Sequence, residues 1–235
     1  MRLGIFDSGE GGKNLVRHLK AREPHIDTVF LCDRARAPYG VKSREELRDI
    51  VTNNLETLRT AGADRVLIAC CTACTVYGEL DRAQMRMATP IITPTARAAR
   101  GATESGRVAV IATRATVRSH AFARALGRCC VAEIEAQPLV HIIDRGACDE
   151  AADTDTVRLV ELLLLPLRDC GADTLVLGCT HFSSLSGVIA RAAERYGITH
   201  VIDSAREGAW AIPLARFMRD GIDYTMTTKN TQKGK

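Results

Sequence analysis

Two cysteines stand at equivalent places in two similar stretches of the chain. Gly62-Ala63-Asp64 precedes an apolar run that ends at Cys70. Gly171-Ala172-Asp173 precedes a second run that ends at Cys179, with the same offset (70 − 62 = 8 and 179 − 171 = 8). Each copy predicts a turn, a buried strand and a thiol where the next helix begins. A helix N-terminus lowers the pKa of a thiol, so we expect two reactive thiols that face one substrate.

Two further residues could handle protons beside these thiols. His181 lies two residues after Cys179 and could exchange a proton with its thiol or with a substrate. Asp7 ends the first predicted strand and could orient or deprotonate Cys70. Such groups are typical of general acid–base catalysis at a carbon atom.

The turn that follows Asp7 predicts a carboxylate ligand. Its sequence, Ser8-Gly9-Glu10-Gly11-Gly12, could hold a small carboxylate on backbone N–H groups. It matches neither nucleotide-binding glycine motif. No lysine lies at the end of a predicted strand, where a Schiff-base lysine for pyridoxal phosphate would be expected, so this cofactor is not indicated. We therefore expect no cofactor.

A competing chemistry comes from Cys71-Thr72-Ala73-Cys74, which is formally a C-x-x-C motif. At a strand-to-helix junction this motif is typical of thioredoxin-like redox proteins. A zinc site is less favoured, because no second cysteine pair stands at a matching spacing. No bound metal is expected.

Composition restricts the classes of partner. The chain has 235 residues, 46% hydrophobic and 26% charged, with a net charge of +4. Positive and negative residues alternate, and only residues 229–235 are plainly basic, so we expect no nucleic-acid partner. No apolar run predicts a membrane span, and no signal peptide is visible. Nine cysteines without a disulfide pattern indicate a reducing, cytoplasmic setting.

Predicted strands and helices alternate along the chain, and the strands are continuous apolar runs. This pattern indicates parallel sheets covered on both faces, in the α/β class. The pattern restarts near Arg107, which predicts two similar three-layer α/β domains related by a pseudo-two-fold axis. We expect one domain from residues 1–94 with 206–235, and the other from 95–205. Ligands bind beyond the carboxyl ends of parallel strands, so the site should lie in the cleft between them.

Four local expectations are more detailed. A helix should follow the first thiol strand to about Met87, and a strand should run from Pro90 to Thr93. One helix should span about Val117 to Leu126. A last helix, capped by Asp203 and Ser204, should reach about Arg219.

Five segments, taken together and in order, resemble the glutamate racemases of the aspartate/glutamate racemase superfamily, which are cofactor-independent. The segments are Gly4-Ile5-Phe6-Asp7-Ser8-Gly9 with Gly11-Gly12, Ala37-Pro38-Tyr39-Gly40, Ala69-Cys70 with Thr72-Ala73, Ala112-Thr113 with Ala115-Thr116-Val117, and Gly178-Cys179-Thr180-His181. The match runs from residue 3 to about residue 210.

The resemblance implies that Cys70 and Cys179 are the two acid/base thiols and that Asp7 and His181 assist them. The positions that resemble substrate-binding positions of the family are Ser8, Pro38, Tyr39, Gly40, Cys71, Thr72, Thr113, Thr116 and Thr180. Two residues depart from the family pattern. Cys71 stands where the family has an asparagine, and Asp144 stands where it has a glutamate.

The expected function is therefore interconversion of L- and D-glutamate, a small dicarboxylic amino acid, by proton transfer at Cα. The resemblance also implies a homodimer and a place in peptidoglycan synthesis for the cell wall. Three alternatives stay open at this point. They are a racemase-like protein that acts weakly or on aspartate, a thiol redox protein that uses Cys71 and Cys74, and a module that binds an amino acid without turnover.

Overall fold

The computed structural model describes residues 1–212. In this part of the chain, eight strands form two parallel sheets of four. In the first sheet the order is β2 (Thr28–Cys32), β1 (Leu3–Asp7), β3 (Arg65–Ile68), β4 (Ala88–Pro90). In the second it is β6 (Cys130–Glu135), β5 (Val108–Ala112), β7 (Thr174–Gly178), β8 (His200–Asp203). Both sheets thus have the same order, which confirms the predicted repeat. The strands before the two thiols, β3 and β7, occupy equivalent central places.

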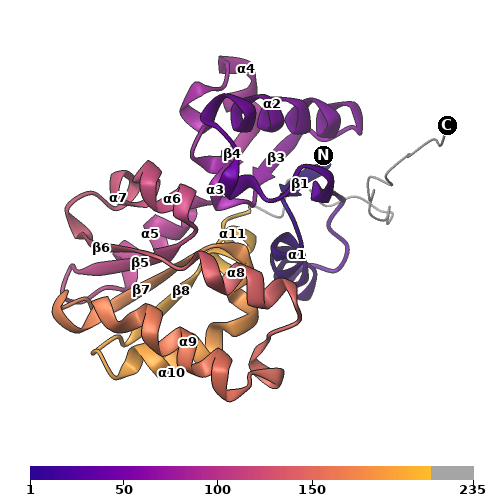
Figure 1. Ribbon diagram of the computed structural model, residues 1–235. Helices are drawn as coiled ribbons and strands as arrows, with labels where there is room; N and C mark the ends of the chain where they lie inside the picture. Colours follow the sequence, from indigo (N-terminus) through magenta and orange to yellow (C-terminus); the bar gives the residue numbers. More distant parts are fainter. Residues whose placement is uncertain (213–235) are drawn as a thin grey trace.

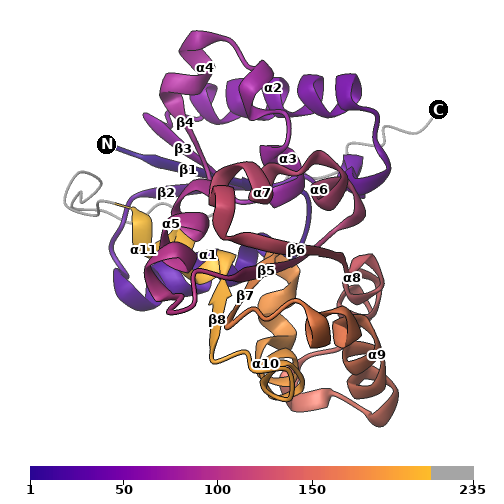
Figure 2. The same cartoon turned by 90° about the vertical axis from the view of Figure 1, so that its left-hand side faces the viewer.

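Helices cover the two sheets and fill the space between them (Figure 1). On the outer side of the first sheet lie α2 (Arg44–Thr60) and α4 (Arg82–Met87), and on the outer side of the second lie α9 (Thr154–Leu164) and α10 (Ser186–Glu194). Between the sheets are α1 (Gly11–Arg22), α5 (Ile92–Ala102) and α11 (Ser204–Ala211), as both views show (Figure 2). The remaining α-helices are α3 (Cys71–Cys74), α6 (Arg114–Ser119), α7 (Ala121–Leu126) and α8 (Gln137–Asp144). Short 3₁₀ turns are η1 (Arg34–Arg36), η2 (Tyr39–Val41), η3 (Tyr77–Glu79), η4 (Gly127–Cys129), η5 (Asp149–Ala151), η6 (Leu165–Asp169) and η7 (Thr180–Leu185).

The larger hydrophobic core extends across both sheets. It contains the first sheet together with Val108 and Val110 of β5, whereas Ala109 and Ile111 of the same strand belong to a second core on the outer face. This alternation along β5 is the two-residue period of a strand buried on both faces. The helices between the sheets therefore form a shared middle layer. A boundary between residues 94 and 95 would cut α5, and the predicted division into domains stays a prediction.

Two of the expected elements between residues 71 and 93 differ in the structure. The helix predicted to reach Met87 is interrupted, because Asp81 starts α4 with a capping box to Gln84. The strand predicted from Pro90 ends there, and α5 begins at Ile92. A proline is tolerated in the first helical turn, so Pro94 does not prevent this start.

Two other helices differ from expectation. The helix predicted over 117–126 is two helices, because His120 between them has a positive φ of 51°. The last helix begins after Asp203, which caps it as predicted, and α11 ends at Ala211. The stretch from 213 to Arg219 lies outside the described residues. Within residues 1–212, no helix combines the length and apolarity needed to cross a bilayer.

Candidate active site

A cavity of about 290 Å³ lies where the carboxyl ends of strands from both sheets meet. Eleven of the thirteen sequence-predicted site residues line it. They come from both halves of the molecule, the first built on the sheet with β1–β4 and the second on the sheet with β5–β8. They are Ser8, Pro38, Tyr39, Gly40, Cys70, Cys71, Thr72, Thr113, Cys179, Thr180 and His181. Asp7 and Thr116 are fully buried and are not part of the wall.

The thiol of Cys70 is a protonated group in this cavity. Cys70 follows β3, is only 6% exposed, and its Sγ lies 3.3 Å from Oγ of Ser8. Burial, followed by the negative charge of Asp7, raises the pKa of Cys70 to about 11. The expectation of a lowered thiol pKa is therefore wrong here, because the four-residue helix α3 does not offset the desolvation.

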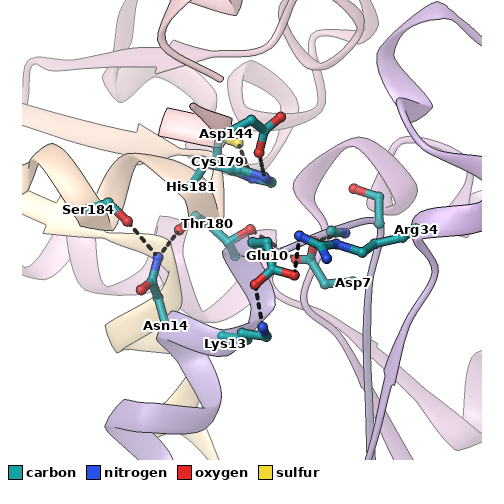
Figure 3. Close-up of polar contacts among 12 residues, drawn as sticks. Asp7, Glu10, Lys13, Asn14, Arg34, Asp144, Cys179, Thr180, His181 and Ser184 are labelled. Carbon is teal, nitrogen blue, oxygen red and sulfur yellow. Dashed lines mark hydrogen bonds and ion pairs between the residues drawn. The ribbon is translucent and has the colours of Figure 1, made fainter. Parts of the chain in front are cut away.

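Cys179 is held in the same way at the end of β7. Burial raises the pKa of the Cys179 thiol well above its usual value, although a hydrogen bond from the backbone N–H of His181 opposes the rise. Nδ1 of His181 lies 3.7 Å from Sγ of Cys179, and its Nε2 lies 3.3 Å from Oδ1 of Asp144 (Figure 3). Thiol, imidazole and carboxylate thus form a chain from the cavity wall to the half-exposed Asp144, along which a proton can pass.

Asp7 connects the two halves beneath the cavity. The hydroxyl of Thr180 donates to Oδ2 of Asp7 at 2.9 Å, and the N–H of Gly9 donates to Oδ1 at 3.0 Å. Burial raises the pKa of Asp7, and the charge of His181 opposes this rise. A carboxyl group with a raised pKa is a better proton acceptor at neutral pH than an exposed one.

Three threonine hydroxyls form a cluster beside the cavity. Oγ1 of Thr72 lies 2.9 Å from Oγ1 of Thr113, which lies 2.9 Å from Oγ1 of Thr116. Thr72 and Thr113 line the cavity, whereas Thr116 stands behind them. Thr116 is therefore placed to orient the two hydroxyls rather than to contact a ligand.

The side chain of Tyr39 points away from the cavity at its polar end. Its hydroxyl donates to Oδ2 of Asp33 at 2.5 Å and accepts from Nδ2 of Asn54 at 2.9 Å. Burial and this hydrogen bond raise the pKa of Tyr39. Tyr39 therefore contributes its backbone and ring to the cavity wall, whereas its hydroxyl forms hydrogen bonds within the protein.

Sequence reasoning missed several residues of the wall. They are Arg34, Ala37, Gln137 and Val140. The wall also contains Asp144, and Gly9 and Glu10 of the turn predicted to hold a carboxylate. Arg34 pairs with Glu10, with Nη2 and Oε1 2.6 Å apart, and is the only lysine or arginine of the described chain in this wall. Arg34 and Gln137 each follow the end of a strand by two residues, so the strand-end rule could have found them.

The pair Cys71 and Cys74 does not resemble a reactive dithiol. Both are buried and free, and burial raises the pKa of each. Sγ of Cys71 lies 3.8 Å from Oγ of Ser204, whereas the thiol of Cys74 donates to the carbonyl of Ile68 at 3.4 Å. Redox dithiols depend on a lowered pKa and on access to a partner. Neither thiol has a lowered pKa, and Cys74 does not line the cavity. Among residues 1–212, no cluster of three or more histidine, cysteine or acidic side chains could hold a metal ion.

Known proteins of one family resemble this chain along most of its length. The model of the family described as Asp/Glu/Hydantoin racemase matches residues 12–212. A glutamate racemase from Corynebacterium kroppenstedtii is 35% identical over 230 residues, covering 93% of this chain and 76% of that protein. One from Mycobacterium leprae is 37% identical over 190 residues, covering 80% and 69%.

Solved structures agree with the sequence relatives. Glutamate racemase isoform RacE1 from Bacillus anthracis superimposes with a TM-score of 0.81 at 27% identity, covering 96% of this chain and 86% of that one. The glutamate racemase from Aquifex pyrophilus gives a TM-score of 0.71 at 29% identity, with 94% and 85% covered. The chain therefore belongs to the Asp/Glu/hydantoin racemase family.

Proposed function

We propose that this chain is a glutamate racemase that inverts Cα by proton transfer between two thiols, without a cofactor. The observation that carries the proposal is the placement of Cys70 and Cys179. They follow equivalent strands of two repeated sheets and line one cavity. The relatives named as glutamate racemases support glutamate as the substrate.

The reaction needs one thiolate and one thiol at the same time. The thiolate takes the proton from Cα, and the electron pair of the broken C–H bond stays on the substrate as a carbanion. The thiol on the opposite face then gives its proton to that carbon and becomes the thiolate. Product therefore leaves the two cysteines with exchanged roles, ready for the opposite direction.

Substrate binding helps to form the thiolate. Burial keeps both thiols protonated at neutral pH. A substrate ammonium group brings a positive charge beside them, which lowers a thiol pKa. Asp7 can accept the proton of Cys70, and His181 with Asp144 can accept that of Cys179.

The remaining wall is suited to a dicarboxylic amino acid. The hydroxyls of Ser8, Thr72, Thr113 and Thr180 and the backbone of Pro38-Tyr39-Gly40 offer hydrogen bonds to carboxylates and ammonium. Thr116 orients Thr72 and Thr113, and Cys71 adds a weak hydrogen-bonding group. Arg34 offers the positive charge for the side-chain carboxylate. A cytoplasmic setting fits nine cysteines that are all free. A homodimer, which light scattering would test, belongs to the proposal as well.

The decisive experiment follows the α-proton. The protein is incubated with L-glutamate or L-aspartate in deuterium oxide, and α-deuteration and chirality are read by NMR and circular dichroism. We expect deuterated D-glutamate to form and aspartate to react far more slowly. Cys70→Ser and Cys179→Ser should each lose racemisation. Wild-type racemisation by both single variants would refute the two-thiol mechanism, and a flat signal with the wild type would refute the function.

A further inference from the structure

Asn14 is a buried amide that joins the two halves of the molecule. It lies in α1, directly after the turn that follows Asp7, and is 7% exposed. Its Nδ2 donates to the carbonyl of Thr180 at 2.9 Å and to Oγ of Ser184 at 3.3 Å, both in η7 of the second half (Figure 3). Nη1 of Arg17 donates to its Oδ1 at 2.9 Å. Because a guanidinium can only donate, this contact fixes which end of the amide faces η7.

Asn14 is hydrogen-bonded to Thr180, the residue that lies between Cys179 and His181. The hydroxyl of Thr180 donates a hydrogen bond to Asp7, and the carbonyl of Thr180 accepts one from Asn14. Both partners belong to the half that carries Cys70. The segment with the second thiol is thus tied at two points to the half with the first thiol.

The start of α1 packs against the same segment without space to spare. A Cβ at Gly11 would lie 2.4 Å from Oγ1 of Thr180 and 2.6 Å from Nδ1 of His181. The backbone of Gly11 therefore limits how close η7 can approach, and the Asn14 amide keeps it from moving away.

We infer that Asn14 is a positioning residue that sets the location of Cys179 and His181 relative to Cys70. This inference rests on the proposed function. Two acid/base groups on opposite faces of one carbon must both stand within proton-transfer distance, and a displacement of about 1 Å costs about a hundredfold in rate. A residue that only satisfied a buried carbonyl would affect stability but would not affect one thiol more than the other.

The test compares the two reaction directions. With substrate deuterated at Cα, the isotope effect reports the step in which a thiolate removes that deuteron. In Asn14→Ala the Cys179 segment is released. Removal by Cys179 should then become slower, and the isotope effect should rise for the enantiomer that Cys179 deprotonates. For the other enantiomer, return of the proton by Cys179 becomes limiting, so the isotope effect should fall or stay unchanged. In Cys179→Ser and Cys70→Ser, loss of the α-deuteron to solvent from one enantiomer only shows which enantiomer the remaining thiol deprotonates.

We expect kcat of Asn14→Ala to fall about tenfold to a hundredfold. Arg17→Ala keeps Asn14 but removes the hydrogen bond to its Oδ1. It should change kcat and the isotope effects in the same direction but less, and it replaces Asn14→Ala as the test if that variant does not fold. The matched control is Thr95→Val in α5, which removes a buried hydrogen bond from Oγ1 to the carbonyl of Ile91 (2.8 Å) away from the cavity. It should change urea stability and leave both isotope effects as in the wild type.

Equal changes of the isotope effect in both directions would overturn the inference, as would kinetics for Asn14→Ala and Arg17→Ala that match those of Thr95→Val. In either case the wild type would still racemise glutamate. Failure of the proposed function itself would instead appear as no racemisation by the wild type.

Discussion

Burial decides the protonation state of both cavity thiols. The sequence placed Cys70 and Cys179 correctly, because a polar residue after a buried parallel strand lies at the carboxyl edge of its sheet. The direction of their pKa shift was predicted wrongly from sequence, because desolvation depends on packing against segments that are distant in the chain. The sequence shows the helix that follows a cysteine but does not show how deeply the thiol is buried.

Cys71 is a residue at which this chain departs from the pattern of the racemases it resembles. Cys71 lines the cavity, but its thiol, 3.8 Å from Oγ of Ser204, is a weak hydrogen-bonding group. We expect Cys71→Asn to raise kcat/KM for glutamate about tenfold, because a hydrogen bond to a charged group contributes about 1.5–3 kcal/mol. Steady-state racemisation measured by circular dichroism tests this. An unchanged or lower value, with the fold intact, would show that the thiol suits the substrate of this protein.

Arg34 offers a second test at the level of one side chain. Arg34→Ala removes the only lysine or arginine in the described cavity wall. We expect KM for glutamate to rise about threefold to fivefold, since an exposed charge contact contributes about 1 kcal/mol. Lys13→Ala is the control, because Lys13 pairs with the same Glu10 but does not line the cavity. Equal effects of the two substitutions would show that Arg34 acts only through Glu10.

At the scale of the elements, α1 packs closely against η7, which contains Thr180 and His181. Gly11→Ala would force its first turn away from Thr180 and His181, which lie less than 3 Å from the new Cβ. We expect kcat to fall about a hundredfold while the far-UV circular dichroism is unchanged. Gly78→Ala is the matched control, because a Cβ there meets nothing within 4 Å. An active Gly11→Ala protein would show that η7 can shift without harm.

Elements were predictable from sequence where their signals were local. The capping box of α2, from Ser43 to Glu46, marks its first turn, and the structure has it. The break between α3 and α4 could have been found from Asp81 and Gln84, which form a second capping box. In contrast, the start of α5 at Ile92 depends on burial of an isoleucine pair between two sheets. No local signal distinguishes that pair from a strand.

At the scale of the whole molecule, the buried thiols make stability depend on alkaline pH. Folding raises the pKa of Cys70 from 9.0 to about 11. The stabilisation is complete below pH 9, because both states are then protonated, and it is lost as pH rises through 9 to 11, because the unfolded thiol ionises first. Such a rise corresponds to about 3 kcal/mol.

We therefore expect the free energy of unfolding to decrease between pH 9 and pH 11, with a smaller decrease in Cys70→Ala than in the wild type. Urea titrations with a reductant at pH 8, 9, 10 and 11 measure the difference between the two proteins. Parallel curves would contradict the prediction. The variant removes one buried thiol only, so a residual decrease from Cys32, whose pKa is also raised to about 11, should remain.

The repeat made the architecture predictable from one sequence. Two copies of Gly-Ala-Asp with a cysteine eight residues after the glycine gave both central strands, and the identical strand orders follow from that duplication. The shared middle layer was not predictable, because contacts such as that of Asn14 with Thr180 join residues far apart in sequence.

The burial that keeps the two cavity thiols protonated also affects how the protein ages. Alkylating agents and peroxides attack the thiolate and not the thiol, so a cysteine whose pKa is about 11 is a slow target at neutral pH. The cavity thiols are thereby protected from such attack. Under the proposed mechanism this protection decreases during turnover, because bound substrate favours ionisation. Loss of function under oxidative stress should accordingly track how often the enzyme works rather than how long it has existed.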